Sequence, residues 1–202
     1  MGEADSDDEL MILFQRERDY TAFEKLFRQH KDALLCFLVR LLRNLATAHD
    51  ASQQTWLKVI AVARKGTYIA DSGVRFRTWL FTLARHHVID EYQRRFAATK
   101  TVALTDELRD EFLEGAARAD FTCADPEDHV HRQQLVKRLN EAVWRLPLEQ
   151  REVIALWAAG LDVTAIASIT GAPRDTVQSR RKYALAKLRD ALSDLLMEDE
   201  QR

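Results

Sequence analysis

The densest group of side chains suited to a binding chemistry follows Pro173, in the last fifth of the chain. Arginine favours guanine edges, glutamine can hydrogen-bond adenine, and lysine and serine mostly hold phosphates. Six side chains that can contact DNA in these ways stand close together: Arg174, Thr176, Gln178, Ser179, Arg180 and Lys182. Asp175 lies among them and would favour a helix dipole but repel phosphate, so it either caps a helix or discriminates between bases. The group predicts a DNA-binding surface.

Other reactive side chains do not form a catalytic or metal-binding set. His86 and Asp90 are four residues apart, a spacing that more simply stabilises one helix face than supplies acid–base catalysis. Cys123, His129 and His131 are loosely grouped, but the CxxC or HxxxH pairs of zinc sites are missing. The chain also has no Gly-rich phosphate loop and no nucleophile elbow. We therefore expect no enzyme activity, no bound metal and no cofactor, while metal or redox sensing by the cysteine and its two histidines stays open.

Two short helices and a tight turn are predicted to position the basic group. Residues 162–170 carry Ile166 and Ile169 at the spacing of one buried helix face. Gly171 can adopt the positive φ that follows a helix end, and Pro173 suits the first turn of the next helix. Together these are the parts of a DNA-binding helix-turn-helix. The alternative is an ordinary helical hairpin with a solvated basic face.

The rest of the chain is also predicted to be helical. Only three prolines and six glycines interrupt 202 residues, and no alternating β-branched run indicates a strand. Apolar offsets of three, four and seven predict a helix from Tyr20 to Arg43, and Thr47 is expected to cap the next helix, which ends at Gly66. Further helices are expected at residues 76–95, 107–117, 127–145 and 147–160. The fold class is therefore all-α.

Charge alternates along the chain, although the formal net charge is only −2. Residues 21–95 hold thirteen bases and six acids, residues 100–128 hold three bases and nine acids, and residues 130–190 hold eleven bases and six acids. Two basic blocks around an acidic one indicate two polyanion-binding modules and a linker that avoids DNA. We predict two small helical domains joined by a flexible acidic linker. The boundaries are an acidic N-terminal extension with a helix start (1–19), a first domain (20–96), the linker (97–128), a second domain (129–196) and an acidic tail (197–202).

Two blocks resemble one family, the extracytoplasmic-function (ECF) group of bacterial sigma-70 factors. The segment LPLEQREVIALWAAGLDVTAIA…GAPRDTVQSR is similar to the family's fourth conserved region, where LPxxQREV, GL, IA and PxxTVxSR are typical. The segments AHDASQQTWLKV and FRTWLFTLARHHVIDEYQRR resemble its second region. The resemblance covers about residues 20–95 and 130–192, and it implies sigma region 2 in the first domain and sigma region 4 in the second.

The resemblance implies an alternative sigma factor that binds core RNA polymerase and directs promoter-specific transcription initiation, commonly in a stress response. Region 2 is expected to dock on a coiled coil of the largest polymerase subunit, to recognise the −10 element and to help melt the DNA. Region 4 is expected to bind the −35 element and to touch the polymerase flap. An anti-sigma factor is the expected further partner.

The expected location is cytoplasmic, at the inner membrane face where the anti-sigma factor is membrane-bound. No apolar run approaches the length of a membrane span, so no direct membrane insertion is expected.

Site residues carry over from the resemblance by position. Four residues on one predicted helix match the polymerase-docking motif: His49, Asp50, Gln53 and Gln54. The family has glutamates at some of these positions. Recognition of the −10 element falls on the loop that holds a flipped base in the family and on the helix after it: Tyr68, Asp71, Ser72, Arg77, Arg85 and His86. His86 stands where the family usually has asparagine. Recognition of the −35 element falls on the six side chains after Pro173.

A free-standing helix-turn-helix regulator that binds operators as a dimer is the alternative function. It accounts for the C-terminal block but leaves residues 20–95 and the linker without a role. Binding of the isolated chain to palindromic duplex sites would favour it.

Overall fold

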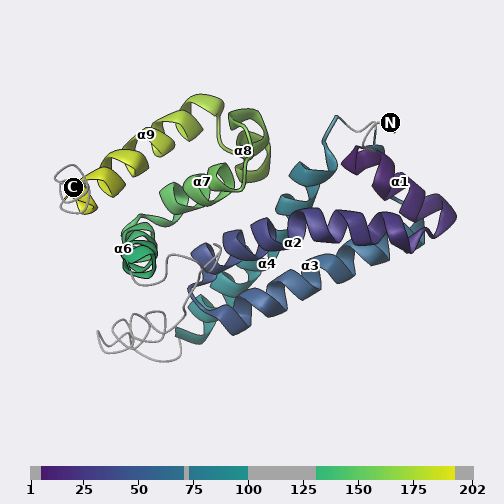
Figure 1. The fold of residues 1–202 in the computed structure, drawn as a ribbon, viewed down its shortest axis with the longest axis horizontal. Helices are drawn as coiled ribbons and strands as arrows, with labels where there is room; N and C mark the ends of the chain where they lie inside the picture. Colours follow the sequence, from purple (N-terminus) through teal and green to yellow (C-terminus); the bar gives the residue numbers. More distant parts are fainter. Residues whose placement is uncertain (1–5, 71–72, 100–130, 194–202) are drawn as a thin grey trace.

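The computed structural model describes residues 6–70, 73–99 and 131–193, and every regular element in these ranges is a helix (Figure 1). The prediction of an all-α fold is confirmed for this part of the chain. The acidic linker beyond residue 99 and the helix expected at residues 107–117 lie outside the described residues. The helices are α1 (Asp7–Glu17), α2 (Tyr20–Leu42), α3 (Leu45–Lys65), α4 (Phe76–Thr99), α6 (His131–Arg145), α7 (Leu148–Ala158), α8 (Val163–Thr170) and α9 (Arg174–Ala191).

The first four helices form a bundle around an apolar core. Helix α2 contributes a wide stripe that includes Leu26, Leu34 and Phe37, all fully buried, as its three- and four-residue offsets predict. Helix α1 packs against α2, α3 and α4 and adds Met11 and Phe14 to the same core. The segment before residue 20 is therefore part of the bundle.

The corners of the bundle are fixed by polar caps. The cap of α3 is Asn44, whose side chain accepts from the backbone N–H of Thr47 at 2.9 Å. The prediction that Thr47 itself is the cap is wrong, because Asn44 already supplies the acceptor one turn earlier. Arg18 ends α1 in the left-handed region and donates to the carbonyls of Ala63 and Arg64 at 3.3 and 3.0 Å, which joins the α1–α2 corner to the end of α3.

The helix-turn-helix expected near the carboxyl end is present. Asp162 caps α8 by accepting from the N–H of Ala165 at 2.8 Å, and Gly171 ends the helix at φ 70°. Pro173 then precedes α9, as expected for a residue with fixed φ at a helix start. The alternative of a simple hairpin does not account for the third helix α7, which packs against both α8 and α9.

The C-terminal helices lie against the bundle and share its core. Leu156 on α7, Ile166 on α8 and Val177 on α9 belong to the same buried cluster as the stripe of α2. Helix α7 contacts α2, and α8 contacts α4, so the green and yellow helices of Figure 1 lie along one side of the bundle. The two predicted domains therefore pack against each other as one body, which we call the closed form.

Candidate functional site

Helix α9 presents a largely polar face to solvent, on which Tyr183 and Leu185 are the exposed large apolar side chains. Val177, Ala184 and Leu188 are buried and fix which side of the helix faces the core. Four of the six residues predicted to bind the −35 element are exposed, and Thr176 and Arg180 are half-buried. The neighbouring Arg181 lies over the ring of Trp157, 5.7 Å from its centroid. The structure therefore brings all six predicted residues together on one helix.

A second exposed face lies on α3. All four residues predicted to dock polymerase, His49, Asp50, Gln53 and Gln54, are exposed there. Leu57, one turn further on, is 49% exposed and adds an apolar side chain to the same helix face. Leu57 was not among the predicted residues, although its spacing of four residues from Gln53 is visible in the sequence.

Two of the predicted −10 residues on α4 form hydrogen bonds with α7 and with the residue that follows its C-terminal end. The Nε of Arg85 donates to a carboxylate oxygen of Glu152 at 2.6 Å, and the two side chains are 23% and 11% exposed. Arg77 donates to the carbonyl of Ala159. His86, on the same helix, is exposed. In this closed form the two arginines face α7 and its C-terminal end.

The contact between the two halves leaves several arginine nitrogens unpaired. Arg43 donates to the carbonyl of Trp144, yet the Nε atoms of Arg43, Arg77 and Arg151 are buried without a hydrogen-bond partner among the described residues. Burial lowers the pKa of Arg43, and the nearby charge of Arg151 lowers it further. Buried donors without acceptors are costly, so this contact is less favourable than its apolar core alone would make it.

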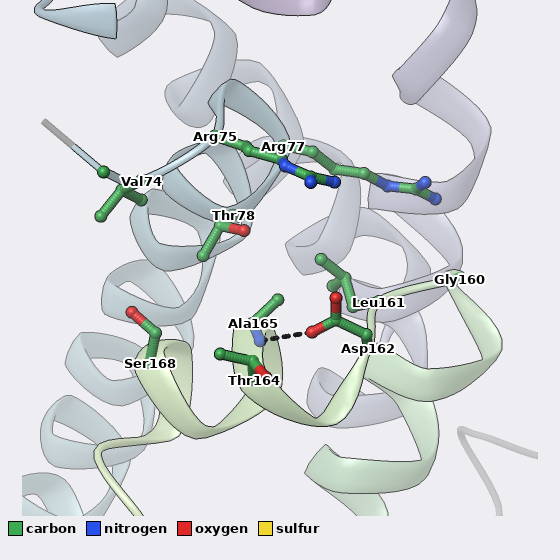
Figure 2. A pocket seen from close by; sticks show the side chains of 11 residues that line it. Val74, Arg75, Arg77, Thr78, Gly160, Leu161, Asp162, Thr164, Ala165 and Ser168 are labelled. Atoms are coloured by element: carbon green, nitrogen blue, oxygen red, sulfur yellow. Dashed lines mark hydrogen bonds between the residues drawn. The ribbon is translucent and has the colours of Figure 1, made fainter. Parts of the chain in front are cut away.

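A hollow of about 370 Å³ lies between the start of α4 and α8 (Figure 2). Arg75 and Arg77 lie along one side of it in the view, and Thr164 and Ser168 approach from α8. Asp162 lines it too, but its carboxylate already caps α8. The lining of this hollow is therefore polar and of mixed charge, with two arginines, one carboxylate and several hydroxyls.

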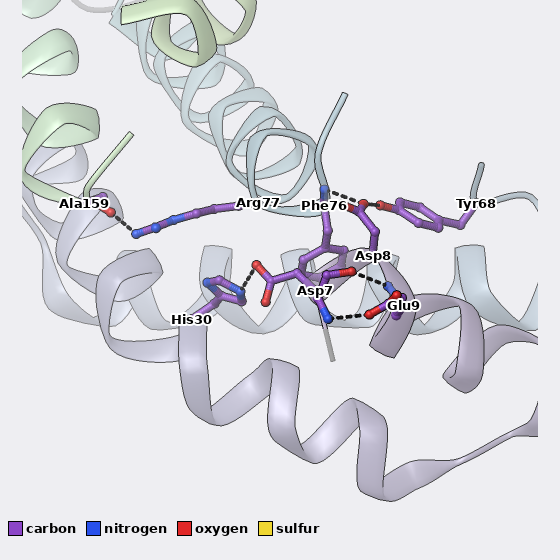
Figure 3. A network of polar contacts seen from close by, with 9 residues as sticks. Asp7, Asp8, Glu9, His30, Tyr68, Phe76, Arg77 and Ala159 are labelled. Carbon is purple, nitrogen blue, oxygen red and sulfur yellow. Dashed lines mark hydrogen bonds and ion pairs between the residues drawn. The ribbon is translucent and has the colours of Figure 1, made fainter. Parts of the chain in front are cut away.

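Tyr68 is placed differently from an exposed base-binding side chain. Its ring is 7% exposed and lies edge-on to Phe76 and Trp79, at 6.2 and 5.2 Å between centroids. Its hydroxyl donates to Asp8 on α1 (Figure 3). Burial and the carboxylate of Asp8 raise the pKa of Tyr68 far above its usual value, so the hydroxyl remains a donor. Asp71 and Ser72, the other predicted residues of this loop, lie outside the described residues.

The same part of α1 holds a second acid. Asp7 accepts from His30 of α2 at 2.9 Å, and His30 is 5% exposed. The hydrogen bond from His30 lowers the pKa of Asp7 below its usual value against the opposing effect of burial. The sequence could not show these roles of Asp7 and Asp8, because the partners of both acids lie far away along the chain.

Within the described ranges no group of three or more His, Cys, Asp or Glu side chains is arranged to hold a metal ion. Cys123 and His129, named above as potential sensors, lie outside these ranges. His131 begins α6, but its side chain is not among those described. No described helix has both the length and the apolar character that a membrane crossing needs.

Comparison with known proteins identifies the class of this fold as RNA polymerase sigma factors. The Sigma-70 region 2 family matches residues 26–96. ECF RNA polymerase sigma factor BldN of Streptomyces coelicolor is 30% identical over 196 residues, which are 95% of this chain and 69% of the relative. RNA polymerase sigma factor CarQ of Myxococcus xanthus is 29% identical over 186 residues, 91% of this chain and 96% of the relative.

Two solved structures share the fold. Sigma factor RpoE in complex with the anti-sigma factor NepR from Bartonella quintana aligns with a TM-score of 0.64 at 21% identity, covering 85% of this chain and 96% of that chain. CnrH in complex with the cytosolic domain of CnrY aligns with a TM-score of 0.61 at 22% identity, covering 96% of this chain and 99% of that chain. These likenesses concern the fold.

The chain belongs to the ECF family of RNA polymerase sigma factors. It is an alternative sigma factor that directs transcription, and the interpretation as a free-standing helix-turn-helix regulator is not favoured.

Proposed function

We propose that this sigma factor recognises promoters with two separate faces, the −35 element with α9 and the −10 element with α4 and the loop before it. The observation that carries the proposal is the polar face of α9, whose opposite side is held by buried Val177, Ala184 and Leu188. A helix fixed on its apolar side with its N-terminal half exposed is suited to enter the major groove. Two arginines of α9 are proposed to hydrogen-bond guanine edges, Arg174 near its start and Arg180. Gln178 is proposed to hydrogen-bond adenine.

Docking on core RNA polymerase falls to the exposed face of α3. His49, Asp50, Gln53 and Gln54 form its polar part and Leu57 its apolar part. One carboxylate, rather than several, makes this face less acidic than the family motif, so the contact depends more on hydrogen bonds and on Leu57. The expected polymerase partners are the coiled coil of the largest subunit for region 2 and the flap for region 4.

Recognition of the −10 element by α4 requires that the C-terminal helices move away from it. Arg85 is paired with Glu152, and Arg77 donates to the carbonyl of Ala159. A guanidinium that is held by a protein carboxylate and shielded from solvent is not free to neutralise a DNA phosphate. The closed form is therefore the form of the free chain, and the promoter-bound form has α7 and α8 released from α2 and α4.

An anti-sigma factor is the proposed regulatory partner, and both structural relatives described above were solved with a partner protein. Such a partner would act by occupying the DNA- and polymerase-binding faces. The chain works in the cytoplasm and has no catalytic chemistry of its own, since the chemistry of transcription belongs to the polymerase. The two proposed promoter-binding units are the bundle, in which α1 joins residues 20–96, and residues 129–196.

Transcription start mapping tests the proposal. The chain is added to core RNA polymerase with genomic DNA, and start sites are compared with those of core enzyme alone. We expect a set of starts that share two sequence elements, and Arg180→Ala to lower transcription from them about tenfold, which corresponds to about 1.4 kcal/mol.

Arg189→Ala is the matched control, because Arg189 is an exposed arginine in the last turn of the same helix. It should retain the activity of the unmodified chain. A chain that neither co-purifies with core enzyme nor adds new starts would overturn the proposed function.

A further inference from the structure

One carboxylate on α1 connects both ends of the segment between α3 and α4. The same oxygen of Asp8 accepts from the hydroxyl of Tyr68, soon after α3 ends, and from the backbone N–H of Phe76 at 2.9 Å, where α4 begins (Figure 3). The first N–H groups of a helix have no partner within the helix, so Asp8 supplies from another element an acceptor that α4 needs. Asp8 is thereby bonded to the two anchor points of the segment at once.

Gln15, two turns further along α1, fixes the first anchor a second time. Its side-chain oxygen accepts from the N–H of Tyr68 at 2.8 Å, and its side-chain nitrogen donates to the carbonyl of Tyr68 at 3.1 Å. Both backbone groups of Tyr68 are therefore satisfied by one side chain of α1. The backbone of Tyr68 and its hydroxyl are therefore both held by side chains of α1, which lie outside the promoter-binding segment.

The surroundings of these bonds make them rigid. The ring of Tyr68 is buried between Phe76 and Trp79, and Phe76 is fully buried. A hydrogen bond in a partly buried site is stronger than the same bond in water, and a carboxylate acceptor strengthens it further. Loss of Asp8 would leave a buried hydroxyl and a helix-end N–H without their acceptor.

We propose that Asp8 is a positioning residue for promoter opening, which acts by holding Tyr68 and Phe76, the two anchors of the segment that meets the −10 element. The inference rests on the proposed function, since it assigns to α1 a part in the same step. Extruding a base from the duplex costs free energy, and anchor residues that are already held in place do not add the cost of their own ordering to it. Asp8 touches no DNA in this role.

The rate of promoter opening is the measurement that distinguishes a positioning role of Asp8 from a general contribution to the stability of the fold. Holoenzyme is assembled with Asp8→Ala or Tyr68→Phe, on a promoter found by start mapping with the unmodified chain. Closed-complex formation is measured by binding to the duplex promoter, and opening by the permanganate reactivity of thymines around the −10 element. We expect core binding and closed-complex formation to change less than about twofold and the opening rate to fall about tenfold. Hydrogen exchange in the Tyr68–Phe76 segment of the free chain should become faster in both variants.

Two neighbouring acids of α1 give matched controls. Glu9→Ala removes the 2.7 Å bond that the N–H of Ser6 donates to the Glu9 carboxylate, and so weakens the cap of α1 without changing a contact of the segment. Asp7→Ala removes the bond with His30. Both controls should open the promoter at the rate of the unmodified chain on duplex DNA.

Asp8→Asn keeps an acceptor oxygen and should restore most of the opening rate. Unchanged opening in Asp8→Ala and Tyr68→Phe, or an equal loss in Glu9→Ala, would overturn the inference while leaving the proposed function intact. An unmodified chain that supports no initiation would instead overturn the proposed function, and this inference with it.

Discussion

Asp7 and Asp8 are adjacent acids whose partners lie on different elements. Asp7 pairs with His30 on α2, and Asp8 binds Tyr68 and the start of α4. The sequence predicted an acidic extension followed by the start of a helix near Leu10, whereas the helix already begins at Asp7, after a capping box of Ser6 and Glu9. It could not predict the partners, because the Asp8 contacts span 60 and 68 residues and nothing local specifies them.

Because of the pair of Asp7 and His30, we predict that the free energy of unfolding decreases at acidic pH. The pKa of Asp7 is lowered in the folded chain from its ordinary 3.8. As pH falls, the Asp7 carboxylate therefore becomes protonated in the unfolded chain at a higher pH than in the folded chain. The stabilisation is fully present above about pH 3.8 and is lost as pH falls through the lower folded pKa. Asp7→Asn should cost about 1–2 kcal/mol at neutral pH, and its difference from the unmodified chain should shrink below about pH 3.8.

Thermal unfolding from about pH 5 to about pH 2.5 measures this difference. Asp32→Asn is the control, because the Asp32 side chain is 79% exposed and 3.9 Å from Lys31. It should change stability little at any pH. A gap between Asp7→Asn and the unmodified chain that stays constant down to the lowest pH would contradict the assignment.

At the scale of elements, the sequence predicted the helices well and their mutual packing poorly. The bounds of α2 and α8 and the start of α4 follow from apolar spacing and from residues such as Asp162 and Gly171, which act within a few positions of themselves, whereas α4 runs to Thr99, past its predicted end at residue 95. The exposed faces of α3 and α9 follow from the same spacing. The contact of α7 with α2 was not predictable, since periodicity shows that a face is buried but not what covers it.

The end of α8 gives a prediction for the helix-turn-helix. Gly171 has φ 70°, and a Cβ added to it would meet nothing within 4 Å, so only backbone strain opposes a side chain. Gly171→Ala should destabilise the chain by about 1 kcal/mol. Gly171→Asn should cost less, because asparagine tolerates the left-handed region better. Urea unfolding of the two variants checks the order, and an equal or reversed cost would show that strain at this turn does not matter.

At the scale of the whole molecule, two predicted domains are closed into one body. The ion pair of Arg85 and Glu152 links α4 to α7, and it can be removed without changing the apolar contacts between the two halves. Glu152→Gln should weaken closure by about 1–2 kcal/mol, since the pair is neither fully exposed nor fully buried. We expect a larger radius of gyration in solution scattering and stronger binding to promoter DNA in the absence of polymerase.

Glu149→Gln is the control for this prediction. Glu149 is exposed in the first turn of the same helix α7 and should leave both measurements unchanged. A Glu152→Gln chain that is as compact as the unmodified one and binds DNA no better would show that the ion pair does not hold the halves together.

The unpaired arginine nitrogens between the two halves bear on how tightly partners bind. A partner that accepts only the separated form has an apparent dissociation constant equal to its intrinsic value divided by the fraction of molecules that are open. Arg43, Arg77 and Arg151 lose little when the halves part, because their buried Nε atoms gain water. Under the proposed function, closure therefore raises the apparent dissociation constant for promoter DNA, and a substitution on the α7 side of the contact, such as Glu152→Gln, would lower it without altering a residue assigned to polymerase or DNA binding.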